Sequence, residues 1–232
     1  MNIYVVSVGY NCQKYVSEWY NSLQRQLIPF KVFVAVDDLP TYHYVEALKC
    51  KRITLMPFEK TRGYAAYNRW QCLQEIKNLD DGIVVQLDLD DGLIANSLTK
   101  IRDYYIEHKK RCVIGSSFNT MSGQRMNQQT YNTKTMDNNK FIDDPIFKCP
   151  PTRTFHTSLI KELKEDDFKI DGEWIKMCTD VALFFSIFDK IHNKELGILP
   201  EKTYLYRDKR PDSTFGQYKQ LIFQQLKAKW RK

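Results

Sequence analysis

Strand-like and helix-like patterns of apolar residues alternate along the first 90 positions of the chain. Short apolar runs of strand length, rich in β-branched residues, cover positions 3–8, 31–36, 52–56 and 83–88. Between these runs, apolar residues recur at helical spacing over positions 14–26, 42–48 and 64–78. Leu39 and Pro40 are expected to turn the chain after the second run. The alternation predicts a parallel sheet covered by helices.

The second half of the chain has a less regular pattern. We expect helices at 98–107 and 179–191, strands at 113–115 and 204–206, and a short helix or strand-to-helix junction at 155–163. Thr179 is expected to cap the second of these helices, with Asp180 in its first turn. Residues 119–140 are polar and lack periodicity, which predicts a long loop or a loose hairpin.

Three carboxylates stand where the fourth apolar run ends, at Asp88, Asp90 and Asp91, and Gly92 follows them. Open α/β sheets bind ligands at the carboxyl ends of their strands. Carboxylates this close repel one another unless a cation sits among them, and oxygen ligands suit Mg²⁺ or Mn²⁺, which hold substrate phosphates. The segment therefore predicts a metal–diphosphate site, with a solvated acidic turn as the alternative. Asp91 is expected to bind through water or to contact solvent.

A second acidic pair, Asp37 and Asp38, ends the run at 31–36. Right-handed crossovers would bring this pair and the cluster at 88–91 to the same edge of the sheet. Two acidic groups at one ligand-binding edge favour a functional role over a solvated turn.

Composition limits the class of protein. A chain of 232 residues with 43% hydrophobic and 27% charged residues is typical of one sizeable globular domain. It has no apolar run near the roughly 20 residues of a membrane span, and its beginning lacks the pattern of a signal peptide. We therefore expect a cytoplasmic protein whose six cysteines are free thiols.

The chain carries a net charge of +7, which is compatible with phosphorylated substrates or an anionic membrane. Its basic residues are dispersed, apart from Lys109, Lys110, Arg111 and the last few positions. Nucleic-acid-binding proteins usually show a denser basic stripe, so we expect no nucleic-acid partner.

Four stretches occur in an order that resembles the family 2 glycosyltransferases with the GT-A fold. They are Val-Val-Ser-Val-Gly-Tyr-Asn at 5–11, Val-Ala-Val-Asp-Asp at 34–38, Arg-Gly-Tyr-Ala-Ala-Tyr-Asn-Arg at 62–69 and Asp-Leu-Asp at 88–90. The resemblance runs from residue 3 to about 214. It implies a single α/β domain at 1–214, with a Rossmann-like, mostly parallel mixed sheet flanked by helices. Its nucleotide-binding half would span about 1–92 and its acceptor half about 93–214.

The resemblance also implies a metal-dependent, inverting glycosyltransferase. Such an enzyme moves a sugar from a nucleotide diphosphate sugar, with a UDP-sugar favoured, to a hydroxyl of a glycan or glycolipid acceptor. Asp180 would be the general base, and Asp88 and Asp90 would hold Mn²⁺ or Mg²⁺. Contacts with the nucleotide sugar are expected at Val8, Tyr10, Asp37, Arg62, Arg69, Asp88, Leu89, Asp90, Arg207 and Lys209, and contacts with the acceptor at Trp174 and His156.

The chain departs from the family pattern at three positions. Tyr67 stands where the family often has Arg, and Thr179 precedes Asp180 where a second carboxylate is usual. A histidine that often follows the late Tyr-Arg pair is absent, and Lys209 and Arg210 stand nearby. These departures leave the roles of Arg62 and Arg69 open and put a histidine metal ligand in doubt.

Two rival functions stay open at this point. A phosphatase of the haloacid dehalogenase type has a similar strand followed by Asp-x-Asp, although that motif does not normally continue as Asp91-Gly92. A catalytically inactive domain that only binds sugar nucleotides is the other rival. Residues 215–232 predict a basic amphipathic helix, which would either pack against the parent domain or give peripheral contact with an anionic membrane.

Overall fold

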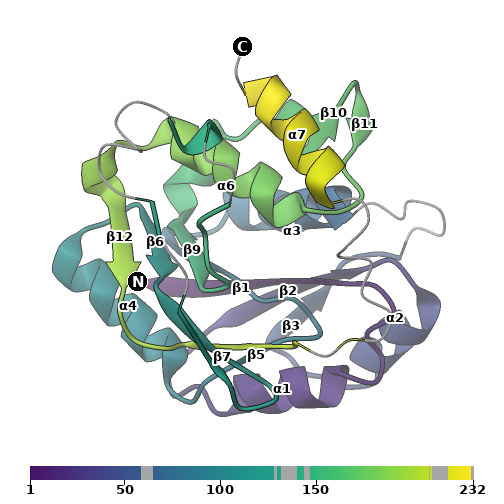
Figure 1. Ribbon diagram of the computed structural model, residues 1–232. Coiled ribbons are helices and arrows are strands. Elements are labelled where there is room, and N and C mark those ends of the chain that lie inside the picture. Colours follow the sequence, from purple (N-terminus) through teal and green to yellow (C-terminus); the bar gives the residue numbers. More distant parts are fainter. Residues whose placement is uncertain are drawn as a thin grey trace.

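A computed structural model describes residues 1–58, 65–127, 130–131, 140–143, 147–208, 210 and 219–230, with only the backbone of residues 140 and 219–223. A seven-stranded sheet forms its centre, in the order β12-β6-β9-β4-β1-β2-β3. Only β9 among these strands runs antiparallel to its neighbours. The mixed, mostly parallel sheet flanked by helices confirms the predicted architecture (Figure 1).

The first half follows the predicted alternation of strands and helices. Its elements are β1 Asn2–Gly9, α1 Val16–Gln24, β2 Lys31–Val36, α2 Leu39–Glu46, β3 Ile53–Leu55, α3 Ala65–Lys77 and β4 Gly82–Gln86. The main difference lies at Leu39 and Pro40, which begin α2 instead of forming a separate turn. Proline fits the first turn of a helix because its missing N–H would have no helical partner there.

The second half is built from pairings between distant residues. β9 Arg153–His156 lies between β4 and β6 Cys112–Gly115, and β12 Leu196–Leu199 extends the sheet beside β6. A smaller sheet joins β5 Gly92–Leu93, β13 Tyr204–Tyr206, β7 Ser117–Thr120 and β8 Arg125–Asn127. The polar stretch thus begins with a β-hairpin made by β7 and β8. The predicted junction at 155–163 is the end of β9 followed by a 3₁₀ turn.

Helices cover both faces of the central sheet. In Figure 1, α3 and α6 Thr179–Lys190 lie on one face, and α1 and α4 Ser97–His108 lie on the other. Each face has its own apolar cluster, and seven residues of α6 belong to one of them. The remaining short elements are the hairpin β10 Lys169–Ile170 and β11 Glu173–Trp174, and the 3₁₀ helices at Lys140–Ile142, Thr157–Glu162, Glu165–Phe168 and Asn193–Glu195.

The start of α6 differs from the sequence prediction. Cys178, not Thr179, is the residue before the helix, and it adopts a left-handed conformation with φ of 57°. No side chain caps this end of the helix. Thr179 is the first helical residue, so Asp180 lies in the first turn as expected.

The C-terminal helix α7 Lys219–Trp230 packs against α6 and β10. Leu226 is fully buried, and Lys229 pairs with Asp166 at 3.2 Å and donates to the carbonyl of Lys169 at 2.7 Å. These contacts support packing against the parent domain, while membrane contact stays a prediction. No helix in the described ranges is both long and apolar enough to cross a membrane. All six cysteines are free.

Candidate functional site

The carboxyl ends of β1, β2 and β4 meet at one edge of the sheet because these strands are parallel. The N–H of Asp37 donates to the carbonyl of Gly9 at 3.1 Å, and the N–H of Leu89 donates to the carbonyl of Val8 at 3.1 Å. A Cβ added to Gly9 would lie 2.8 Å from the side chain of Leu89, so this close approach requires glycine. Both acidic segments therefore lie at the same edge, as the strand order predicted.

Asp37 and Asp38 have different roles despite being neighbours. Asp38 caps α2 by accepting from the N–H of Thr41 at 2.8 Å, and it also accepts from the N–H of Asn11 at 2.7 Å. Asp37 accepts from the side-chain amide of Asn68 at 2.7 Å. Burial raises the pKa of Asp37, and the nearby charge of Asp38 raises it further, whereas the Asn68 hydrogen bond opposes the shift. Asp38 thus stabilises the fold, and Asp37 is the carboxylate available to a ligand.

Asp88 is paired with Arg69, a buried residue of α3. The Nη2 to Oδ1 distance is 3.1 Å, and Arg69 also donates to the side-chain oxygen of Gln86. Burial raises the pKa of Asp88; Arg69 opposes this shift, and Asp90 and Asp180 add to it. The side chain of Asp88 still exposes 38% of its surface, which makes it reachable from solvent. Two buried donors beside it, Nε of Arg69 and Nε2 of Gln86, have no hydrogen-bond partner in the described structure.

Asp90 is held by an arginine from the C-terminal part of the chain. Nη1 of Arg210 lies 2.8 Å from Oδ2 of Asp90, and Nη2 of Arg210 donates to the carbonyl of Tyr10 at 2.6 Å. The guanidinium group thus ties Asp90 to the end of β1. Tyr10 itself is 64% exposed, so its ring is open to a ligand.

Asp91 anchors β13 to the acidic segment. Its Oδ2 accepts from the hydroxyl of Tyr204 at 2.7 Å, and its Oδ1 accepts from the N–H of Arg207 at 2.7 Å. Asp91 is buried, and this burial raises its pKa well above the usual range, with Asp90 and Asp88 adding to the shift. The expectation that Asp91 contacts solvent or binds through water is therefore wrong, because both of its oxygens are engaged inside the protein.

The side chain of Arg207 is also engaged in contacts within the protein. Its Nε donates to the carbonyl of Asp90 at 2.7 Å, its guanidinium lies 4.2 Å from the ring centre of Tyr15, and it pairs with Glu18.

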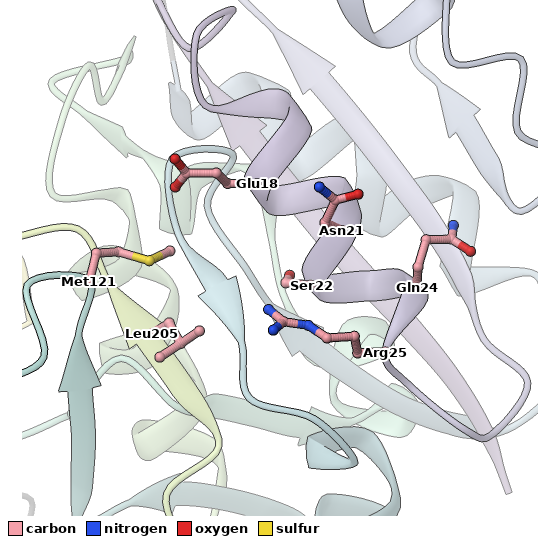
Figure 2. A pocket seen from close by; sticks show the side chains of 7 residues that line it. All are labelled: Glu18, Asn21, Ser22, Gln24, Arg25, Met121 and Leu205. Atoms are coloured by element: carbon pink, nitrogen blue, oxygen red, sulfur yellow. The ribbon is translucent and has the colours of Figure 1, made fainter.

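Glu18 also lines a pocket of about 550 Å³ between α1 and the smaller sheet (Figure 2). In this view Arg25 and Ser22 lie along α1, and Met121 and Leu205 face them from the other wall. Arg207 therefore connects this pocket to the acidic segment.

Asp180 is paired with Arg153, a residue that the sequence analysis did not single out. Nη1 of Arg153 lies 2.8 Å from Oδ2 of Asp180. Although burial lowers the pKa of Arg153, the charges of Asp180, Cys149 and Asp88 outweigh it and raise the pKa overall. Arg153 was missed because its position depends on β9 entering between β4 and β6, and no local pattern in the sequence indicates that pairing.

The two predicted acceptor residues lie in different places. Trp174 packs edge-to-face on Tyr67 of α3, with ring centres 5.0 Å apart, next to the helix that carries Asn68 and Arg69. His156 pairs with Ile83 at the amino end of β4, whereas Arg153 pairs with Gln86 near Asp88. Burial lowers the pKa of His156, which lines a small pocket with the basic run at 109–111. The structure does not bring His156 to the acidic edge.

The remaining residues predicted to contact the nucleotide sugar fall into two groups, one buried and one outside the described residues. The side chains of Val8 and Leu89 are buried, and their backbones are joined by a hydrogen bond at the sheet edge. Arg62 and Lys209 lie outside the described residues.

A divalent cation fits the chemistry of Asp88 and Asp90, which are hard oxygen donors. In the described ranges, no group of three or more His, Cys, Asp or Glu side chains is arranged to hold a metal. Mg²⁺ commonly uses one or two carboxylates and completes its shell with water and substrate phosphates. Asp88 and Asp90 would thus hold the ion together with a bound diphosphate.

The comparisons with known proteins identify the family and the fold of this chain. A sequence model of glycosyl transferase family 2 matches residues 4–190. The chain belongs to glycosyl transferase family 2, and its fold is the GT-A fold of that family.

Poly(ribitol-phosphate) beta-N-acetylglucosaminyltransferase TarS of Staphylococcus aureus is 24% identical to this chain over 216 residues. These residues are 90% of this chain and 36% of TarS, so the chain spans about a third of that relative. The crystal structure of S. aureus TarS 1–349 with UDP-GlcNAc has a TM-score of 0.74 at 21% identity, covering 99% of this chain and 66% of that one. The complex of TarS 1–349 with UDP gives 0.70 at 20% identity, covering 99% and 65%.

Proposed function

We propose that this chain is a metal-dependent, inverting glycosyltransferase that moves a sugar from a UDP-sugar to a hydroxyl of a glycan or glycolipid acceptor. The observation that carries the proposal is the grouping of Asp37, Asp88 and Asp90 at one sheet edge, with Asp180 beside them on α6. Family membership and the similarity to TarS bound to UDP-GlcNAc support the class of donor. The phosphatase alternative has no comparable support.

Asp37 would accept hydrogen bonds from the nucleotide base or the ribose. Its carboxylate is half-buried, and the amide of Asn68 already fixes one of its oxygens. A fixed acceptor at the strand end suits a polar group on a planar base or a sugar ring, because little side-chain freedom is lost on binding.

Asp88 and Asp90 would face the diphosphate with their arginines. When bound, a divalent ion at these carboxylates stabilises the negative charge that develops on the leaving diphosphate. Arg69 and Arg210 carry donors in a planar fork that matches phosphate oxygens. Both arginines pair with carboxylates in the structure, so we expect them to redistribute their hydrogen bonds when the diphosphate binds.

Asp180 would act as the general base. It lies in the first turn of α6, where the helix dipole favours a negative charge. The acceptor hydroxyl loses its proton to Asp180 as its oxygen bonds to the anomeric carbon, and the bond to the diphosphate breaks with its electron pair. A single displacement of this kind inverts the anomeric configuration. Trp174 would stack on a sugar face of the acceptor.

A donor screen tests the proposal. Thermal unfolding is measured with UDP-GlcNAc, UDP-glucose and GDP-mannose, each with and without Mn²⁺. A donor at 100 times its Kd should add about 2.7 kcal/mol to the free energy of unfolding, and only with Mn²⁺ present. Release of the nucleoside diphosphate, UDP or GDP, measured on the same donors reports turnover.

Each outcome has a distinct meaning. Binding of a UDP-sugar with Mn²⁺ and release of UDP support the enzyme. Binding without turnover, with water and a range of glycan acceptors present, would indicate the inactive sugar-nucleotide-binding domain. Absence of binding by every nucleotide sugar would overturn the proposal.

A further inference from the structure

Arg153 reaches the site from a strand that runs against the others. It is the first residue of β9, and it pairs with Gln86 on β4 and with Ile114 on β6. Because β9 is antiparallel to β4, its beginning lies at the edge where β4 ends, two residues before Asp88. The topology thus delivers a cationic side chain to the edge that carries the acidic residues.

Hydrogen bonds fix the guanidinium group in place. Its Nε and Nη2 donate to the carbonyl of Cys149 at 3.2 and 3.1 Å, and the group lies 5.7 Å from the ring centre of Phe147. Its Nη1 pairs with Oδ2 of Asp180 at 2.8 Å, and only 16% of the side chain is exposed. The hydrogen bonds to Cys149 and the contact with Phe147 leave the Arg153 side chain little freedom to adopt another rotamer. The remaining nitrogen, Nη1, therefore holds the Asp180 carboxylate in a fixed position.

The electrostatic effect acts in both directions. Asp180 raises the pKa of Arg153, and the same attraction stabilises the charged form of Asp180. Cys149 and Asp88 interact with both Arg153 and Asp180, and the tyrosines Tyr204 and Tyr206 of β13 also interact with Arg153. Arg153 is therefore a buried cation among groups that are anionic or can become so.

We propose that Arg153 is a positioning residue for Asp180, and this inference rests on the proposed function. Arg153 sets the orientation of the Asp180 carboxylate and keeps it ionised between turnovers. The Asp180 side chain then need not change its rotamer, and its carboxyl group need not lose a proton, before it takes the acceptor proton. Arg153 itself need not touch the donor, so its loss is expected to affect turnover more than donor binding.

The test compares Arg153→Gln and Arg153→Lys with the wild-type chain. Arg153→Gln should leave the Kd for the donor within about twofold, and it should lower kcat on the order of 10- to 100-fold, which is less than the roughly 10²–10⁴-fold contributed by the general base itself. In a plot of rate against pH, the fall in rate on the acidic side should begin about one pH unit higher in Arg153→Gln. The reason is that a neighbouring cation lowers the pKa of a carboxyl group by about that amount. Arg153→Lys keeps the charge, so the fall in rate on the acidic side should begin at the wild-type pH, and the rate should be partly restored relative to Arg153→Gln.

A matched control is Arg111→Gln. Arg111 also pairs with two carboxylates, Glu162 and Glu195, but it lies near His156 and away from the acidic edge. This variant should change neither kcat nor the rate–pH profile. Thermal unfolding of all variants checks that each one is folded.

A measurement without turnover separates the two proposals. The ¹³C carboxyl resonance of Asp180, identified by its absence in Asp180→Asn, is titrated in the wild-type chain, in Arg153→Gln and in Arg153→Lys. A higher titration point in Arg153→Gln alone supports the inference even if no donor is turned over, in which case only the proposed function fails. An unchanged titration point in Arg153→Gln, or an equal rate loss in both variants with the fall in rate on the acidic side beginning at the wild-type pH, would overturn the positioning role.

Discussion

The two sides of the central sheet differ in how their strands are brought together. β1, β2, β3 and β4 follow one another along the chain, and helices separate them. β9, β6 and β12 pair out of chain order, and β9 runs in the opposite direction. The first side carries the carboxylates proposed to bind the donor, and the second side carries Arg153 beside the proposed base. The comparison indicates that local elements bring the first set of carboxylates to the sheet edge, whereas Arg153 reaches the same edge through pairings between distant residues.

The largest predicted effect on donor binding is at Asp90. Asp90→Ala should remove Mn²⁺-dependent binding of UDP and of UDP-sugars, at least 100-fold in Kd, because one of the two carboxylates proposed to hold the metal and the partner of Arg210 are lost. Isothermal titration calorimetry with and without Mn²⁺ measures this. Asp103→Ala is the control, since among the described residues Asp103 pairs only with its neighbour Arg102, and its side chain is exposed on α4. Unchanged metal-dependent affinity in Asp90→Ala would contradict the donor role of this edge.

The neighbouring pair Asp37 and Asp38 gives a sharper test of the same side. Asp37→Ala should weaken the binding of UDP and of UDP-sugar alike, by roughly 10- to 150-fold, since a hydrogen bond to a charged group is worth about 1.5–3 kcal/mol. Asp38→Ala should instead lower the free energy of unfolding by about 1 kcal/mol through loss of the α2 cap, with little change in affinity. If only the sugar-bearing ligand lost affinity in Asp37→Ala, Asp37 would not contact the base or ribose.

A further prediction on stability concerns the link between the two sides. Tyr204→Phe removes the donor to buried Asp91 and should cost about 1–3 kcal/mol of stability, measured by urea unfolding. Tyr206→Phe on the same strand is the control, because its hydroxyl makes no hydrogen bond with any described residue. Equal losses in both variants would show that Asp91 does not depend on Tyr204.

The sequence predicts the first side of the sheet well because its signals are local. Each strand there is an apolar run, and each acidic residue stands directly after such a run. β9 has four residues of mixed character, Arg-Thr-Phe-His, and it is a strand because β4 and β6 flank it on both edges. Such pairing is decided by tertiary contacts, which a local pattern does not contain.

The same difference explains which site residues were predictable. The place of Asp88 and Asp90 at the sheet edge was predictable because both residues come shortly after β4 in the sequence. The inward direction of Asp91 depends on Tyr204 and Arg207, more than 100 positions later in the chain. His156 and Arg153 lie at opposite ends of β9, so their places could not be assigned without knowing the direction of that strand.

Asp180→Asn tests the central claim most directly, because the amide keeps the shape of the side chain and cannot take the acceptor proton. Donor affinity by calorimetry should change little, while UDP release should fall roughly 10²–10⁴-fold. The wild-type product, observed by NMR, should have the anomeric configuration opposite to that of the donor. Near-normal turnover in Asp180→Asn, or a product that retains the donor's configuration, would contradict a single displacement with Asp180 as its base.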